Sequence, residues 1–498
     1  MTDSQGFDRA STGIEGLDHI LGGGFPRHRM YLIEGDPGVG KTTLALQFLL
    51  EGVRQGEAGV YATLSETEEE LRDVARSHGW SLDGIRICEL QTSEESLKAD
   101  SQYTLFHPSE VELSETTKTV LDIVEQVRPQ RVVFDSLSEM RLLARDSLRY
   151  RRQILALKHY FTGRSCTVLL LDYGSERAGD FQLQTLTHGV MRLEQLAPEY
   201  GGQRRRMRIQ KIRGIQFLAG YHDYLIDRGG LKVFPRLVAA QHHREFAREP
   251  IASGVAELDA LLGGGLDRGT STMVLGPAGV GKSTLAAQYV FAAACRGERC
   301  AVYTFDESPT TWIERGERLG MRLREHRDSG RITIRQVDPA EMAPGEFADD
   351  VRRQVEDGMA GLVIDSLNGY RNSMPEERYL TLHLHELLSY LNQQGVMTLM
   401  IMSQSGILGA DVESPVNLSY LADTVVLLRY FEAFGQVRQA ISTVKKRTSP
   451  HEHSIRELQI SDHGLRLGRE LREFQGVLSG QLQYTGDAQP LMGNNANA

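Results

Sequence analysis

Short apolar runs alternate along the chain with longer segments in which apolar residues recur every three or four positions. In the first half the short runs occupy residues 30–34, 59–64, 131–135 and 167–172. A short apolar run bounded by turn residues is typical of a buried strand, and the longer period is typical of an amphipathic helix. Strands that alternate with helices predict an α/β fold, with a mainly parallel sheet flanked by helices.

The second half of the chain repeats the pattern of the first. Matching segments follow one another in the same order: 12–28 and 253–269, 58–71 and 298–312, 131–140 and 361–370, 208–214 and 442–448, 223–233 and 457–467. A repeat of about 230 residues is too long for a solenoid unit and has the size of a whole domain. We expect a first domain over residues 1–240, a second over 241–475 and a flexible tail over 476–498, with the linker at 236–249.

Each half contains the glycine-rich phosphate-loop pattern G-x-x-x-x-G-K-[ST] between a predicted strand and a predicted helix. The candidate ATP-binding residues are Gly35, Gly38, Gly40, Lys41, Thr42 and Thr43, and in the second half Gly276, Gly279, Gly281, Lys282, Ser283 and Thr284. In this motif backbone N–H groups surround the phosphates, the lysine supplies positive charge and the Thr42 or Ser283 hydroxyl can hold Mg²⁺. Two matches in equivalent contexts favour two ATP sites over a chance glycine turn.

Acidic residues follow other predicted strands in both halves. Asp135 and Asp365 end equivalent strands, where an aspartate can hold Mg²⁺ beside the phosphate loop; a helix N-cap is the alternative. Glu66, and the pair Asp306 and Glu307, follow an earlier strand in their own halves. A carboxylate there can orient and deprotonate an attacking water, so these three are the candidate catalytic residues. Acidic residues also favour the first turn of a helix, which is the plain alternative.

A third element is basic. Lys211 and Arg213, like Lys445 and Arg447, are two residues apart on a predicted strand, so both side chains of a pair should point to one face. The sequence suggests no partner for them inside their own domain. They could reach the triphosphate of a neighbouring subunit. They could instead bind nucleic acid, helped by the basic run at 204–208, or form a solvated edge strand.

Composition narrows the class of protein. The 498 residues carry a net charge of −10, which disfavours a protein coated with nucleic acid. No apolar run approaches the roughly 20 residues that span a bilayer, and the N-terminus lacks the apolar core of a signal peptide. Four cysteines without CxxC spacing suggest no disulfide framework. We therefore expect a cytoplasmic protein without membrane partners.

Together these features resemble the KaiC family of RecA-like ATPases over about residues 12–480. The resemblance includes the tandem domains, the LDxLLGGG-type lead-in to each loop, HGW at 78–80, the K-x-R pairs and LSG at 478–480. It implies a homohexameric double ring that binds ATP and Mg²⁺ between subunits, with Lys211, Arg213, Lys445 and Arg447 approaching nucleotide across the interface. It also implies a signalling or timing role with protein partners.

The resemblance further implies a serine/threonine autokinase in the second domain. Family autokinases phosphorylate a Ser–Thr pair shortly before a D-T strand, and the matching residues here are Ser419 and Tyr420. Ser419 is therefore the candidate phosphosite. The family usually shows two adjacent glutamates after the earlier strand, and here Ser65 and Asp306 replace the first of them. Hydrolysis in the first domain would then depend on Glu66 alone.

Two other function classes share the fold and the loops. A DNA-associated recombinase or helicase of the RecA type is one, but the sequence shows no zinc-finger spacing and no basic stripe interleaved with aromatic residues. An assembly scaffold that binds ATP and barely hydrolyses it is the other. Stimulation of turnover by single-stranded DNA separates the first class from a KaiC-type ATPase, and turnover itself separates the second.

Overall fold

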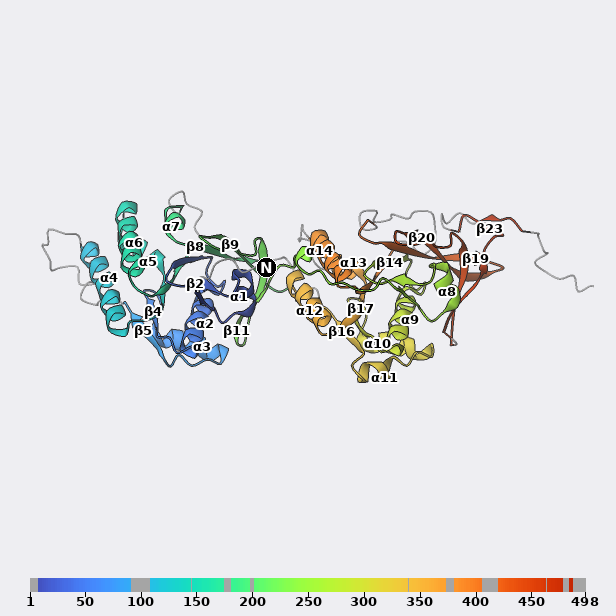
Figure 1. Cartoon of the computed structure of the whole chain (residues 1–498), viewed down its shortest axis with the longest axis horizontal. Coiled ribbons are helices and arrows are strands. Elements are labelled where there is room, and N and C mark those ends of the chain that lie inside the picture. Colours follow the sequence, from blue (N-terminus) through green and yellow to red (C-terminus); the bar gives the residue numbers. More distant parts are fainter. Residues whose placement is uncertain are drawn as a thin grey trace, which may run out of the picture. The chain divides into compact units, whose positions relative to one another are not determined.

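The chain folds into two compact units, Met1–Arg236 and Leu237–Ala498. The computed structural model describes residues 8–90, 108–144, 146–173, 181–197, 201–338, 340–372, 380–404, 420–462, 464–477 and 483–486. Among these residues each unit builds one nine-stranded sheet with helices on its faces (Figure 1). Six strands of each sheet pair in parallel and the remaining three are antiparallel at one edge, so the predicted α/β fold is confirmed.

The first sheet has the strand order β11-β10-β9-β8-β3-β7-β6-β4-β5. Its strands are β3 Met30–Glu34, β4 Gly59–Thr63, β5 Ile85–Glu89, β6 Arg131–Asp135, β7 Thr167–Asp172, β8 Gly189–Leu196, β9 Arg204–Ile212, β10 Tyr221–Asp227 and β11 Gly230–Phe234. The helices are α1 Glu15–Leu21, α2 Lys41–Arg54, α3 Glu68–His78, α4 Pro108–Val127, α5 Leu137–Ala144, α6 Ser147–Thr162 and α7 Phe181–Leu186. A short hairpin of β1 Arg9–Ala10 and β2 Phe25–Pro26 flanks α1.

Both faces of the first sheet are covered by helices. Tyr31 and Ile33 of β3 belong to the same buried cluster as Phe48 of α2, together with residues of α1 and α3. Met30 and Leu32 belong to the opposite cluster, with residues of α4 to α7. Because successive strand residues point to opposite faces, a strand buried on both sides is apolar at nearly every position. This explains why the central strands appear in the sequence as continuous apolar runs.

The second sheet has the equivalent order β16-β15-β17-β18-β14-β19-β20-β21-β22. Its strands are β14 Ser271–Gly276, β15 Arg299–Thr304, β16 Ile332–Gln336, β17 Met359–Asp365, β18 Met397–Ser403, β19 Thr424–Ala433, β20 Gln436–Lys446, β21 Ile455–Ser461 and β22 Gly464–Glu470. The helices are α8 Ala256–Leu261, α9 Lys282–Cys295, α10 Pro309–Arg318, α11 Leu323–Asp328, α12 Pro344–Glu356, α13 Leu367–Asn372 and α14 Leu380–Gln393. Two small hairpins pair β12 Pro250–Ile251 with β13 Leu266–Asp267 and β23 Phe474–Gln475 with β24 Gln483–Tyr484.

The stretch predicted as a linker, 236–249, packs largely against the second unit. The Ala239 N–H donates to Glu386 of α14 at 3.3 Å, and the Arg244 N–H donates to the Gln393 carbonyl at 3.2 Å. A short 3₁₀ turn, Ala239–Gln241, lies against the same helix. Most of the predicted linker is therefore part of the second unit rather than free chain.

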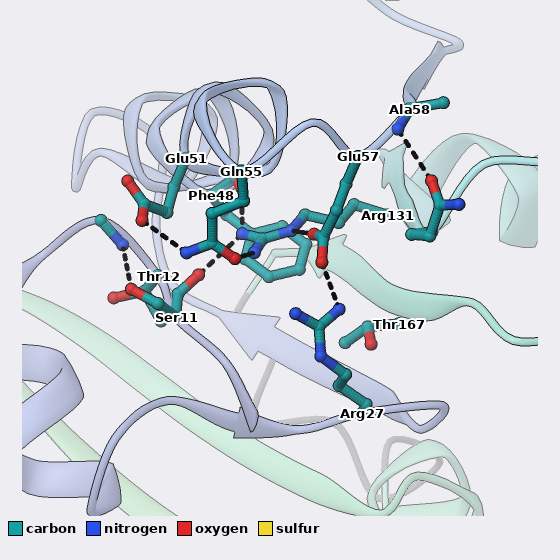
Figure 2. Close-up of polar contacts among 12 residues, drawn as sticks. Ser11, Thr12, Arg27, Phe48, Glu51, Gln55, Glu57, Ala58, Arg131 and Thr167 are labelled. Atoms are coloured by element: carbon teal, nitrogen blue, oxygen red, sulfur yellow. Dashed lines mark hydrogen bonds and ion pairs between the residues drawn. The ribbon is translucent and has the colours of Figure 1, made fainter. Parts of the chain in front are cut away.

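A buried arginine joins two elements of the first unit. Arg131, the first residue of β6, is fully buried. Its Nη1 donates to the carbonyls of Phe48 at 2.6 Å and Ser11 at 2.7 Å, and its Nε pairs with Glu57 at 2.5 Å (Figure 2). Its guanidinium also lies 4.6 Å from the centre of the Phe48 ring. A Cβ on Gly52 would meet the Arg131 side chain at 2.6 Å, so α2 needs a glycine there. The arginine thus fixes α2 against β6.

We expect Arg131→Met to lower the free energy of unfolding of the first unit by about 3 kcal/mol, because it leaves buried carbonyls and part of Glu57 without a partner. Arg54→Met is the matched control. Its ion pair with Glu51 is in the same unit, but 78% of the Arg54 side chain is exposed, so its loss should cost much less than the loss of Arg131.

Urea unfolding followed by Trp80 fluorescence in a Trp312→Phe background measures the first unit within the full chain, since the two tryptophans lie in different units. An equal loss for Arg131→Met and Arg54→Met would contradict the role assigned to the buried arginine.

Candidate functional site

The predicted site residues of the first unit gather at one edge of the sheet. Strands β3, β7, β6 and β4 are neighbours and all pair in parallel, so their carboxyl ends lie together. The phosphate loop, 35–40, follows β3, and Glu66 follows β4. Asp135 ends β6, directly opposite Thr63 in the register. Ligands of open parallel sheets bind at this carboxyl edge.

The glycines of the first loop are required by the surrounding packing. Gly38 and Gly40 have φ of 81° and 94°, in the left-handed region that favours glycine. A Cβ on Gly40 would lie 2.5 Å from the Ile226 side chain, and one on Gly35 would lie 2.7 Å from the Leu193 carbonyl. The adjoining strands therefore hold the loop against the sheet, and α2 begins directly after it at Lys41.

The second loop is built in the same way. Gly279 and Gly281 have φ of 78° and 101°. A Cβ on Gly281 would meet Ile460 at 2.3 Å, and one on Gly276 would meet the Leu428 carbonyl at 2.6 Å. Both loops thus bring a run of backbone N–H groups to a helix N-terminus, an arrangement that binds anions.

The lysine of each loop is buried and bonded to its own loop. The Lys41 ammonium donates to the carbonyls of Gly35 at 2.7 Å and Asp36 at 2.9 Å, and that of Lys282 donates to Pro277 at 2.7 Å. Burial lowers the pKa of both lysines, that of Lys282 to about 8, against the opposing effect of the strand-end carboxylates. Two buried cations with mainly neutral partners favour an anion at the loops.

The hydroxyl that follows each lysine meets the strand-end aspartate. Thr42 donates to Asp135 at 3.2 Å, and Tyr61 donates to the same carboxylate oxygen at 2.5 Å. In the second unit Ser283 is close enough to Asp365 to lower the pKa of that carboxyl against the dominant effect of burial. Among the described residues, the buried Oδ2 of Asp365 has no hydrogen-bond partner. Burial raises the pKa of both aspartates. A hydroxyl and a carboxylate at a phosphate loop are oxygen donors of the kind that hold Mg²⁺. Thr43 and Thr284, the next residues, are buried in the first helical turns.

Helix capping does not account for the acidic residues. Ser366, after Asp365, accepts the N–H of Gly369 at 3.1 Å and so caps α13. In the first unit the cap of α3 is Thr67, which forms a capping box with Glu70. The strand-end carboxylates are therefore available for a ligand.

The carboxylate of Glu66 lies in an unusual environment. Its Oε2 is buried, and no residue in the described ranges forms a hydrogen bond with it. The backbone N–H of Glu66 donates to the Thr63 hydroxyl at 2.9 Å. Burial is the main cause that raises the pKa of Glu66 to about 6, with Asp135 and Glu70 adding to it and Lys41 opposing it. A carboxyl group with this pKa is well suited to take a proton near neutral pH.

The matching carboxylates of the second unit are bonded. Glu307 pairs with Arg315 of α10 at 2.7 Å, and Asp306 accepts a short hydrogen bond from the Ser366 hydroxyl. The sequence pointed to Asp306 and Glu307 but missed Arg315 and, in the first unit, Tyr61. Arg315 lies eight residues after Glu307, about two helical turns, and that spacing is the one signal that could have revealed it.

The expectation that the lysine–arginine pairs lack partners in their own domain is wrong. Every member bonds to a backbone carbonyl just before the neighbouring strand: Lys211 to Gln184, Arg213 to Thr185 at 2.9 Å, Lys445 to Ala422 at 2.7 Å and Arg447 to Tyr420 at 3.4 Å. β9 pairs with β8, and β20 pairs with β19. In both pairs the register shifts just before the lysine. Such a bulge re-aims the side chains that follow it. Each arginine lies one residue beyond its strand, and not on it as predicted.

Two further observations concern the remaining predictions. Ser419 and the segment LSG at 478–480 lie outside the described residues, whereas Tyr420 is described and 52% exposed. Within the described ranges, no helix combines the length and hydropathy of a membrane span.

Comparison with known proteins identifies relatives of the whole chain. The model of the family described as "ATPase: KaiC" matches residues 10–238 and 251–472. The chain is 27% identical to "Circadian clock protein KaiC3" of Synechocystis sp., over 98% of this chain and 97% of that relative. It is 26% identical to "Circadian clock oscillator protein KaiC" of Synechococcus elongatus, over 96% of this chain and 92% of that relative. Both matches span both units.

The environment of Glu66 predicts a pH-dependent stability. Because its folded pKa of about 6 exceeds the ordinary 4.5, Glu66 destabilises the fold increasingly as pH rises between these values. Glu66→Gln should therefore raise the stability of the first unit relative to the wild type above pH about 6, with no difference below about 4.5. Urea unfolding at several pH values measures this difference.

Glu70→Gln is a control of opposite sign. Hydrogen bonds with Thr67 lower the pKa of Glu70 in the folded state. Glu70 therefore stabilises the fold at pH values above its ordinary pKa, and this stabilisation is lost as the pH falls through its lowered pKa in the folded state. This variant should be less stable than the wild type at neutral pH and equal to it in acid. A Glu66→Gln variant that is less stable than the wild type at pH 8 would contradict the environment described for Glu66.

Proposed function

Because the chain belongs to the KaiC family of ATPases, we propose that it binds and hydrolyses ATP with Mg²⁺ at two sites, one in each unit. The observation that carries this proposal is the repeated set at the carboxyl edge of both sheets. Each set has a buried lysine on a phosphate loop, a hydroxyl close to a strand-end aspartate, and a carboxylate after the neighbouring strand. Positioning and charge stabilisation are what phosphoryl transfer needs from a protein.

The residues fit Mg²⁺ and ATP. Thr42 with Asp135, and Ser283 with Asp365, supply a hydroxyl and a carboxylate oxygen. The buried Oδ2 of Asp365 has no hydrogen-bond partner among the residues that the structure describes. When bound, Mg²⁺ neutralises charge on the phosphate oxygens. The loop N–H groups and the lysine hold the phosphates in both units, and the glycines leave room for that approach.

We propose that the carboxylates after β4 and β15 act on the water that attacks ATP. In hydrolysis a water oxygen bonds to the γ-phosphorus, the bond to the bridging oxygen of ADP breaks, and a proton of the water passes to a base. Glu66 in the first unit and Glu307 in the second orient that water and take its proton, with Asp306 as a further candidate. Glu66, half-buried and with a raised pKa, is suited to the task without a second carboxylate at position 65.

We also propose a homohexameric double ring in which the lysine–arginine pairs approach the nucleotide of a neighbouring subunit. Lys211 and Arg213 lie together and bond to neutral carbonyls, and burial and the charge of Arg213 lower the pKa of Lys211. Two adjacent cations in this situation favour an anion supplied from outside the unit. Cations brought to a triphosphate by a neighbouring chain stabilise its developing charge.

A role in DNA recombination or unwinding is not favoured. The basic strand β9 carries its own counter-charge, because Glu194 pairs with Arg206 at 2.9 Å and lies 4.0 Å from Arg208. Both arginines also lie over the Tyr221 ring, at 4.1 and 5.2 Å. We propose instead a cytoplasmic regulatory ATPase with protein partners, in keeping with relatives named as clock proteins.

ATP turnover by the full chain tests the proposal. Glu66→Gln and Glu307→Gln should each remove the turnover of their own unit while leaving ATP binding intact, and the double variant should fall about 10²–10⁴-fold, the usual contribution of a positioned base. Steady-state phosphate release with saturating ATP and Mg²⁺ measures this. A double variant that hydrolyses ATP at the wild-type rate would overturn the assignment of both carboxylates.

Mass measurements test the assembly and the autokinase. With ATP and Mg²⁺, native mass spectrometry should show six chains, and a monomer under saturating ATP would refute the ring. In the same samples, intact-mass analysis of denatured chains should show one phosphate adduct that is lost in Ser419→Ala and kept in Tyr420→Phe. Turnover without any adduct would leave an ATPase that does not phosphorylate itself.

A further inference from the structure

In the second unit an arginine forms an ion pair with Glu307, the proposed acceptor of the proton from the attacking water. Arg315 Nη1 lies 2.7 Å from Glu307 Oε1, with 32% and 25% of the two side chains exposed. The Nε and Nη2 atoms of Arg315 are buried, and no described residue forms a hydrogen bond with them. Glu307 is therefore the polar group that holds this guanidinium at the site.

The geometry of α10 explains how the pair forms. The helix begins at Pro309, after the Ser308 cap, and Glu307 lies just before it. Arg315 is in the second helical turn, and helical side chains lean toward the N-terminus, so its guanidinium extends back toward the strand end. The charge of Arg315 also reaches Asp365, whose pKa it helps to lower against the dominant effect of burial.

The first unit lacks this arginine. Glu66 corresponds to Glu307 in the repeat, and the residue eight positions later is Val74, which corresponds to Arg315. Val74 is half-buried on α3, and Glu66 Oε2 has no hydrogen-bond partner in the part of the chain that the structure describes. The two units thus present the same carboxylate in two states, bonded to a cation in one and unpaired in the other.

We propose that Arg315 is a positioning residue that restrains Glu307 in an ion pair and slows ATP hydrolysis in the second unit relative to the first. The inference rests on the proposed function, in which Glu307 takes a proton from the attacking water. A carboxylate that takes this proton loses its charge and with it the ion pair, so the arginine opposes the step. The pair also engages Glu307 Oε1, and turnover requires this oxygen to be released from the guanidinium.

The full chain with Glu66→Gln, in which only the second unit turns over, tests this directly. In that background Arg315→Val should raise kcat about three- to tenfold, because the proton acceptor is freed, and leave the KM for ATP unchanged. Arg315→Lys keeps a cation at the site and should retain the parent rate. A merely structural role for Arg315 would lower kcat in both variants.

The reciprocal exchange gives a matched control in the other unit. In a Glu307→Gln background, Val74→Arg introduces the arginine eight residues after Glu66 and should lower kcat by a similar factor. Thermal unfolding of each variant shows whether it is folded. An unchanged kcat in both exchanges would overturn the proposal.

One further outcome would show that Arg315 has a different role. If Arg315→Val lowers kcat or raises the KM for ATP, the arginine assists the phosphate rather than restraining Glu307, and the proposal fails. Failure of the proposed function itself is distinguished by the Glu66→Gln, Glu307→Gln double variant, because wild-type turnover in that chain removes Glu307 as the base whatever Arg315 does.

Discussion

The parallel register of four neighbouring strands is the constraint on which each candidate site depends. In the first unit it aligns the ends of β3, β7, β6 and β4, so that the phosphate loop, Asp135 and Glu66 meet at one edge. In the second unit β14, β18, β17 and β15 do the same. A slip of one residue would turn Asp135 to the opposite face of the sheet. The burial of both faces prevents that slip, so the packing of the core positions the site.

The two units reach the same edge geometry with different buried supports. Arg131 fixes β6 to α2 in the first unit, whereas the aligned residue of β17 is Gly361, where a Cβ would lie 2.9 Å from the Cys300 sulfur. Tyr61 bonds to Asp135, and the aligned residue of β15 is Val302. The motif residues are therefore shared while their surroundings differ. Differences in activity between the units should be sought in these surroundings.

Sequence patterns predicted the parts of the molecule that depend on local spacing. The strands, the phosphate loops and the placement of Asp135 and Asp365 follow from apolar periodicity and from one motif. The partners of Lys211 and Lys445 could not be predicted, because they depend on where the chain returns before β8 and β19. The ion pair of Arg315 and the isolation of Glu66 were also missed, since hydrogen bonding and burial of a side chain are decided by the packed surroundings.

Counting bound nucleotides on the full chain tests most directly whether each phosphate loop is a separate nucleotide site. The wild type should bind two ATP per chain. Lys41→Ala and Lys282→Ala should each bind one at the same affinity and the other about 10- to 100-fold more weakly, because a charge-assisted contact worth roughly 1.5–3 kcal/mol is removed. Equilibrium binding of labelled ATP under conditions that prevent hydrolysis gives the count. Two ATP bound at wild-type affinity in either variant would contradict the account.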